Sequence, residues 1–202
     1  MDSNINVKVA VRARPMSRKE IDRGSINVVS VQNNVLTIKA ADGTKEEKTF
    51  TFDYVYDGSV SQTQVYTDLG RPVVKQALEG FNGTIFAYGQ TGSGKTFSMM
   101  GYDENKGIIP QLNDELWVLL QERLASIQNN AQQAEGKASV QFFVTVSFLE
   151  VYNEDIKDLL NPSDKKLKIH ESPDLGIYVE GLAELVSSMC MVYGLLLLKL
   201  FI

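Results

Sequence analysis

The residue types and the spacing needed to hold a chain of phosphate groups occur in one run, Gly89-Gln90-Thr91-Gly92-Ser93-Gly94-Lys95-Thr96. The run fits the pattern G-x-x-x-x-G-K-S/T, in which glycines let consecutive backbone N–H groups turn toward phosphate oxygens. Lys95 can then reach the β- and γ-phosphates, and the Thr96 hydroxyl can coordinate Mg²⁺. A helix that begins at Lys95 would point its positive dipole end at the same anion. The pattern therefore predicts a nucleotide-phosphate site with Mg²⁺ bound through Thr96.

The segments on either side of this run are those that a phosphate loop requires. Residues 84–88 are apolar on both faces apart from Thr84, which is typical of a strand in the middle of a sheet that is covered on both sides. A short helix is predicted from Lys95. A strand leading in and a helix leading out favour a phosphate loop over the alternative, a glycine-rich turn without a ligand.

The rest of the chain predicts strands interleaved with helices. Alternating or short apolar runs between turn residues predict strands at 4–12, 26–31, 35–40, 48–52, 140–148, 167–169 and 177–179. A capping box at 61–64 begins a helix that Pro72 should kink and Gly80 should end. A long amphipathic helix is predicted from Pro110, with apolar residues at helical spacing as far as Ile127. This order predicts an α/β domain without an internal linker.

Composition and charge exclude several classes of protein. The 202 residues are 44% hydrophobic and 22% charged, which rules out a disordered chain. A net charge of −5 argues against a protein that binds nucleic acid through bulk charge. The single cysteine, Cys190, permits no internal disulfide, and no basic and apolar signal segment follows Met1, so we expect a cytoplasmic protein.

Residues 189–202 are almost entirely apolar, interrupted only by Gly194 and Lys199. The segment is shorter than the ~20 residues of a membrane-spanning helix, so no membrane span is predicted. We interpret it as a buried core helix whose covering partners are absent, and a tail anchor is the alternative. An uncovered apolar tail should make the chain prone to aggregation, and cutting after Ser188 should improve its solubility.

A longer segment around the phosphate loop, residues 81–99, resembles the kinesin motor domain almost letter by letter. Further segments resemble the same family in the same order: R-x-R-P at 12–15, then 52–56 with Gln62 behind it, 107–110, 147–160 and 178–188. The resemblance implies the N-terminal part of a motor domain in residues 1–188 and an interrupted helix in residues 189–202. The implied fold is α/β, a P-loop NTPase with a mixed central sheet flanked by helices, here incomplete.

The resemblance also implies a function. Kinesins bind ATP or ADP with Mg²⁺ and, in the complete domain, couple ATP hydrolysis to movement along microtubules, so we expect a cytoplasmic protein of the cytoskeleton. Arg12, Arg14 and Pro15 match the family residues that pack on the adenine, and Phe97 matches the residue on its other face. Guanidinium planes and flat rings suit a π-face. The alternative for Arg12 and Arg14 is a solvated strand end.

A group of basic residues after the phosphate loop could face the microtubule. Lys165, Lys166, Lys168 and His170 could lie against the acidic surface of tubulin. The alternative is an ordinary solvated loop.

The sequence departs from the family at the two motifs that orient the attacking water and sense the γ-phosphate. It has no N-x-x-S-S-R-S-H segment, its only Ser-Ser pair is 187–188, and no Asp is followed by Gly three residues later, as D-x-x-G requires. Phosphoryl transfer depends on positioning and charge around the γ-phosphate, so no residue is assigned as catalytic. The alternatives to a motor are a truncated product that binds nucleotide without turnover, with weak or absent tubulin binding, and a fragment that does not fold stably.

Overall fold

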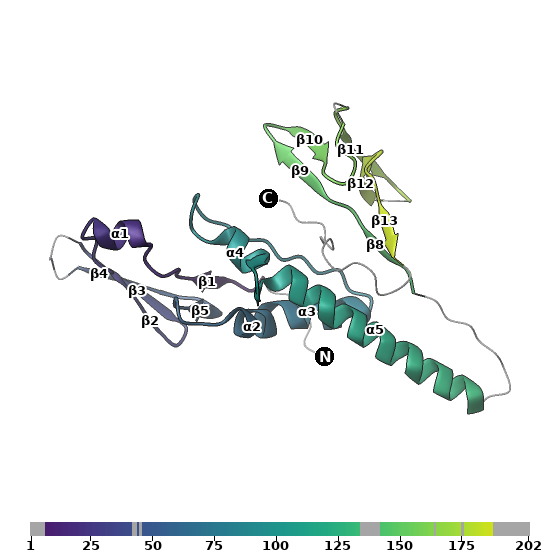
Figure 1. Ribbon diagram of the computed structural model, residues 1–202, viewed down its shortest axis with the longest axis horizontal. Coiled ribbons are helices and arrows are strands. Elements are labelled where there is room, and N and C mark those ends of the chain that lie inside the picture. Colours follow the sequence, from purple (N-terminus) through teal and green to yellow (C-terminus); the bar gives the residue numbers. More distant parts are fainter. Residues whose placement is uncertain are drawn as a thin grey trace. The chain divides into compact units, whose positions relative to one another are not determined.

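A computed structural model of the chain describes residues 7–41, 44, 46–133, 142–163, 165–174 and 176–187 (Figure 1). The chain packs into two compact units, Met1–Ser61 and Gln62–Ile202. The apolar segment 189–202, with the helix, anchor and solubility predictions made for it, lies outside the described residues. Within the described ranges, no helix combines the length and the hydropathy needed to cross a membrane.

The first unit contains a parallel strand pair and an antiparallel three-stranded sheet. Strand β1 (Ala10–Arg12) pairs with β5 (Tyr54–Tyr56), and β2 (Val29–Gln32), β3 (Val35–Lys39) and β4 (Glu47–Thr51) form the sheet in that order. The sheet confirms the strands predicted at 26–31, 35–40 and 48–52. The strand predicted at 4–12 is found at its end only, since residues 7–9 are not in a strand and 4–6 are not described.

The sequence analysis predicts neither strand β5 nor helix α1 (Arg18–Asp22) of this unit. The signal for α1 is present in the sequence as a capping box, Ser17-x-x-Glu20. The Glu20 amide donates to Ser17 Oγ at 3.3 Å, and the Ser17 amide donates back to Glu20 Oε2 at 2.7 Å. These two bonds satisfy donors that a helix start otherwise leaves without partners.

The second unit begins with a helical segment that changes its winding. Helix α2 (Gln62–Val65) continues into a π-helix, η1 (Tyr66–Gly70), and then into α3 (Arg71–Leu78). Pro72, where a kink is predicted, stands in the first turn of α3, directly after the π-helical turn. The helix ends two residues before Gly80, whose φ of 95° is left-handed. The predicted end at Gly80 is therefore confirmed.

Helix α5 (Ile108–Gln133) is the long amphipathic helix, and it begins two residues before Pro110. It contacts α2, η1, α3 and the short helix α4 (Lys95–Met99). The buried apolar side chains at these contacts are Val65, Tyr66, Val74, Met99, Ile108, Ile109, Leu112 and Leu120. Figure 1 shows α5 in teal alongside α2 and α3. This helical layer confirms the α part of the predicted α/β class.

The remaining strands form antiparallel pairs (Figure 1). They are β6 (Gly101–Tyr102) with β7 (Asn105–Lys106), β8 (Val144–Val146) with β13 (Leu185–Ser187), β9 (Leu149–Tyr152) with β10 (Asp155–Asp158), and β11 (Lys168–Ser172) with β12 (Gly176–Glu180). The last pair confirms the strands predicted at 167–169 and 177–179. Of the strand predicted at 140–148, the described residues 142–148 contain only β8. The chain pairs with β13 at residues 144–146 and with β10 at residues 149–152.

The buried central strand predicted at 84–88 is wrong for this structure. Residues 81–89 are in no helix or strand, and Phe86 and Tyr88 are 69% and 94% exposed. A central strand needs a hydrogen-bonded neighbour on each side, and it needs cover on both faces. None of the strand pairs among the described residues includes this segment. Among the described residues, this apolar segment therefore belongs to no sheet.

Candidate functional site

The backbone of the candidate phosphate loop, residues 89–94, has a positive φ at each of its three glycines, Gly89, Gly92 and Gly94. Gly94, the residue before α4, has φ 101°, in the left-handed region that side chains with a Cβ rarely adopt. A Cβ at Gly89 would lie 2.6 Å from the Ser93 Oγ. The Ser93 amide donates to the Gln90 carbonyl at 3.1 Å and closes a turn within the loop. Glycine is thus favoured in the loop by backbone conformation and, at Gly89, also by the nearby Ser93 side chain.

The ammonium group of Lys95 lies against the start of its own loop. Its Nζ donates to the carbonyl oxygens of Gly89 at 2.8 Å and Gln90 at 3.1 Å. Thr96 follows in the first turn of α4 and is exposed, as are Thr91 and Gly92 in the loop. A compact cation and a hydroxyl therefore stand beside an open loop, where an anion from solution can reach them.

The residues present fit Mg²⁺ in the way that phosphate loops hold it. Mg²⁺ prefers oxygen ligands, keeps several waters, and is bound by few protein groups together with substrate phosphates. The exposed Thr96 hydroxyl suits such a ligand set. Among the residues that the structure describes, no cluster of three or more His, Cys, Asp or Glu side chains could hold a metal ion by itself.

Phe97, the predicted adenine neighbour in this unit, is half-buried and stacks on another aromatic ring. Its ring centroid lies 6.0 Å from that of Tyr102, with an angle of 27° between the ring planes. Tyr102 is 63% exposed and belongs to β6, directly after α4. The stacking holds the Phe97 ring beside the loop helix.

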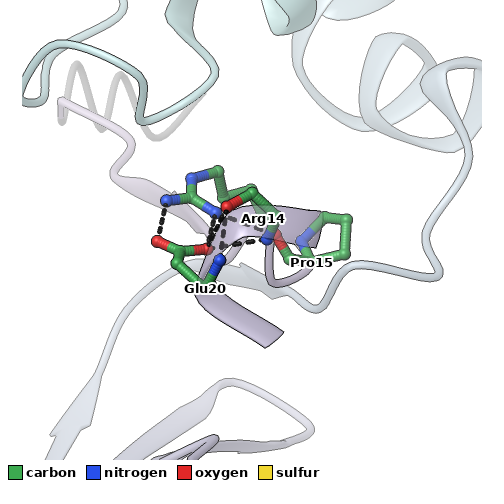
Figure 2. A network of polar contacts seen from close by, with 4 residues as sticks. Arg14, Pro15 and Glu20 are labelled. Carbon is green, nitrogen blue, oxygen red and sulfur yellow. Dashed lines mark hydrogen bonds and ion pairs between the residues drawn. The ribbon is translucent and has the colours of Figure 1, made fainter. Parts of the chain in front are cut away.

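Arg14 is held in the first unit by Glu20 (Figure 2). Its Nη1 and Nη2 donate to the two carboxylate oxygens of Glu20 at 2.8 and 2.7 Å, and Nη1 also donates to the Pro15 carbonyl at 2.9 Å. Hydrogen bonds and charge from Glu20 raise the pKa of the Arg14 guanidinium. Hydrogen bonds from Arg14, and then from Ser17, hold the pKa of the Glu20 carboxyl well below its usual range. This two-point contact sets the plane of the guanidinium.

Arg12 and Pro15 are also held in place within the first unit. Arg12 ends β1, and its Nη2 donates to the Val60 carbonyl at 3.2 Å. Partial burial lowers the pKa of the Arg12 guanidinium, and the charge of Tyr56 opposes this shift. Pro15 lies so close to Gly58 that a Cβ there would be 3.0 Å from the proline Cδ. Arg12 is therefore a half-buried residue at the end of its strand.

The predicted site residues thus fall into two sets. Arg12, Arg14 and Pro15 lie in the first unit, where the structure brings Arg14 and Pro15 into contact. Residues 89–97 lie in the second unit as one continuous loop and helix start.

The basic residues predicted to face tubulin lie just before β11 and along it, and two of them have acidic neighbours. Lys166 Nζ lies 2.7 Å from Asp155 Oδ1. His170 stacks on Tyr178, and its Nε2 approaches Glu180 Oε2 at 3.2 Å, an ion pair only when the imidazole is protonated. Lys165 and Lys168 are exposed. The basic residues and their neighbours therefore combine both signs of charge.

Two residues that the sequence analysis does not assign to the site contact residues that it does assign. Glu20 orients Arg14, and the S-x-x-E capping pattern was the signal for it. Gln62 contacts the helix that carries Lys95 and is separated from Phe97 by 35 residues. Only its place in the family resemblance pointed to Gln62.

Comparison with protein families and curated relatives gives a consistent result. The profile described as Kinesin motor domain matches residues 12–197. The chain is 43% identical over 201 residues to "Kinesin-related protein 1" of Dictyostelium discoideum, covering 90% of this chain and 9% of that protein. It is 43% identical over 183 residues to "Kinesin-like protein Klp68D" of Drosophila melanogaster, covering 87% of this chain and 21% of that protein. The chain thus spans only about a tenth to a fifth of these relatives.

Solved structures agree with this match. A structure of KIF14 with ADP in complex with a microtubule is 38% identical, with a TM-score of 0.72, covering 91% of this chain and 51% of that one. A structure described as that of a fast kinesin is 34% identical, with a TM-score of 0.76, covering 91% of this chain and 49% of that one. The chain spans about half of each solved chain, and the mixed α/β fold that it shares with them confirms the predicted fold class.

Proposed function

The chain belongs to the kinesin motor-domain family, and from this premise we propose that residues 89–96 bind the phosphates of ATP or ADP together with Mg²⁺. The observation that carries the proposal is the contact of Lys95 with its own loop. The Nζ lies within 3.1 Å of two carbonyls of the loop, whose three glycines all have a positive φ. A KIF14 relative has been solved with ADP, which supports the choice of ligand.

The residues of the loop would each act on a different part of the phosphate chain. Backbone N–H groups between Gly89 and Lys95 would surround the β-phosphate, because a loop of this kind can turn consecutive amides to one side. Lys95 would turn its donors from the carbonyls of Gly89 and Gln90 toward phosphate oxygens. Thr96 would ligate Mg²⁺, which neutralises charge on the β- and γ-phosphates.

We further propose that Arg12, Arg14 and Pro15 lie against the adenine and that Phe97 lies on its other face. The support is that a planar side chain in each of the two sets of residues is already held in one orientation by a neighbour. Glu20 sets the plane of the Arg14 guanidinium, and Tyr102 holds the Phe97 ring. Planar groups that are fixed in advance lose less entropy when a flat base packs on them.

In the complete motor domain, we propose that this nucleotide site couples ATP hydrolysis to movement along microtubules in the cytoplasm. The KIF14 relative was solved in complex with a microtubule, which supports tubulin as the partner. The exposed Lys165 and Lys168 are the candidates for contact with its acidic surface.

A second candidate function is nucleotide binding without turnover. The observation that favours it is the absence of N-x-x-S-S-R-S-H and D-x-x-G from the 202 residues. Without groups that orient water at the γ-phosphate, Lys95 and Thr96 still bind the phosphates but do not assemble the transition state.

Replacement of Lys95 by alanine tests the proposed site. Lys95→Ala removes a charge-assisted hydrogen bond worth about 1.5–3 kcal/mol, so affinity for a fluorescent ADP or ATP analogue should fall roughly 10- to 150-fold. The matched control is Lys39→Ala, which removes a lysine paired with Glu47 in the first unit and should leave affinity unchanged. Equal affinities for wild type and Lys95→Ala would remove the phosphate-loop proposal.

A further inference from the structure

Gln62, the first residue of α2, makes a contact to the phosphate-loop helix that the proposed nucleotide chemistry does not use. Its side chain is among the few buried polar ones in the described residues, at 7% exposed. The amide Nε2 donates to the Phe97 carbonyl in α4 at 2.6 Å and lies 3.4 Å from the Asn105 carbonyl in β7. One buried amide therefore joins α2 to α4 and β7, whose contacting residues stand 35 and 43 positions later in the sequence.

The carbonyl that Gln62 binds belongs to Phe97, the third residue of α4. Helix α4 has only five residues, and the last carbonyls of any helix lack partners within it. The Thr96 carbonyl accepts from the Met100 amide, which closes the last regular turn. Gln62 donates to the Phe97 carbonyl, which stands one residue later in the helix. Loss of a hydrogen bond to a partly buried group destabilises the native state.

The orientation of α4 depends on contacts of this kind. A helix of five residues is unstable in isolation, so its neighbours set its direction. The Gly107 amide donates to the Met100 carbonyl at 3.0 Å, and a Cβ at Gly107 would lie 2.5 Å from the Met99 carbonyl. Gln62 donates to the Phe97 carbonyl of the same helix and lies close to Asn105 in β7. The first turn of the helix that these contacts hold carries Lys95 and Thr96.

We propose that Gln62 is a positioning residue for nucleotide binding: it fixes α4 so that the Lys95 ammonium and the Thr96 hydroxyl meet the phosphates and Mg²⁺ together. The inference rests on the proposed function of the loop. Loss of a residue that orients a ligand without touching the bound group typically costs 10–100-fold in affinity.

The test compares Gln62→Met with Gln111→Met. Methionine keeps an unbranched, flexible side chain but donates no hydrogen bond. Gln111 is a matched control, because its Nε2 also donates to two backbone carbonyls, of Lys106 at 2.7 Å and Gly107 at 3.3 Å, and to none in α4. Affinity for a fluorescent ADP is measured with Mg²⁺ and with EDTA, well below the thermal midpoint of each variant.

Gln62→Met should weaken Mg²⁺–ADP binding roughly tenfold and reduce the ratio of affinities with and without Mg²⁺, because Thr96 is no longer held in place. Gln111→Met should lower the thermal midpoint alone. If Gln62 has only a structural role, Gln62→Met should lower the thermal midpoint and leave the affinity for Mg²⁺–ADP unchanged. That result would overturn the proposal. If Gln62→Met does not fold, Gln62→Asn replaces it, since the shorter amide keeps polarity but withdraws the donor from Phe97. Wild type that binds no ADP would instead overturn the proposed function, and this inference with it.

Discussion

At the scale of single residues, the candidate site consists of side chains that are held by the protein before any ligand arrives. Lys95 is held by two loop carbonyls, Phe97 by the Tyr102 ring, and Arg14 by Glu20. Each of these contacts involves a side chain that we propose to bind the nucleotide. The free energy of binding is therefore the difference between the new contacts and those that are exchanged.

The Arg14–Glu20 contact should make stability depend on pH in a defined direction. The native pKa of Glu20 lies below its unfolded value, so its contribution is present at neutral pH and is lost as pH falls below about 4.3 toward the native value. Glu20→Gln keeps a capping side chain at this helix position and removes the charge. Wild type should exceed Glu20→Gln in urea midpoint at pH 7, and the difference should narrow as pH falls below about 4.3.

Asp22→Asn is the control for this measurement, because Asp22 pairs with Arg18 on the exposed side of the same helix. Exposed pairs one turn apart contribute little. A difference between wild type and Glu20→Gln that did not change with pH would show that the carboxylate charge of Glu20 is not what stabilises the native state.

At the scale of elements, the π-helical turn η1 and helix α3 both contact one carboxylate of α5, that of Glu115. The Tyr66 ring lies over Gly70, where a Cβ would be 2.6 Å from the ring Cε2. The Tyr66 hydroxyl donates to Glu115 Oε2 in α5 at 2.7 Å, and Arg71 Nε in α3 donates to the same carboxylate at 2.9 Å. Burial, and then the hydrogen bond to Glu115, raises the pKa of Tyr66.

Tyr66→Phe should therefore destabilise the second unit. Tyr66 is 3% exposed, and its hydroxyl donates to a charged group, so the loss should be about 1.5–3 kcal/mol in the free energy of unfolding, measured by urea denaturation. Tyr102→Phe removes a hydroxyl from a side chain that is 63% exposed and should change stability by less than about 0.5 kcal/mol. Similar values for the two variants would contradict a role for the hydroxyl in joining α5 to η1.

The elements that the sequence predicts correctly are those whose signals are local. Period-two alternation predicts the β2–β3–β4 sheet, helical spacing predicts α5, and the glycine pattern predicts the loop before α4. The prediction of a strand at 84–88 is wrong because a central strand is buried by its neighbouring strands. The residues of the segment itself do not determine whether such neighbours pair with it. In the π-helix the Tyr66 ring packs on Gly70. The role proposed for Gln62 depends on a contact with a residue 35 positions away in the sequence. Neither contact leaves a periodic signal.

At the scale of the whole molecule, nucleotide binding and nucleotide turnover are separable. The 202 residues contain the phosphate loop and the residues proposed for the adenine, but neither motif that orients water and senses the γ-phosphate. Binding requires the first set of residues, whereas hydrolysis requires both.

A polypeptide of these 202 residues should therefore show no microtubule-stimulated ATPase and no microtubule gliding. Phosphate release is measured with and without microtubules, and the Lys95→Ala variant provides the background. Stimulated release by wild type that Lys95→Ala abolishes would show that other residues of the chain orient the water.

Gly94 stands directly before α4, and Gly107 binds the Met100 carbonyl at the other end of that helix. The two positions should differ in the replacements that they accept. Nothing lies within 4 Å of a Cβ built on Gly94, and only its backbone φ of 101° is restrictive. Asn and Asp adopt left-handed conformations more readily than other residues, so they should be the next most frequent there. At Gly107 every side chain begins with a Cβ 2.5 Å from the Met99 carbonyl. In a saturation library selected for soluble expression, sequencing should recover Gly, Asn and Asp at Gly94, and glycine alone at Gly107.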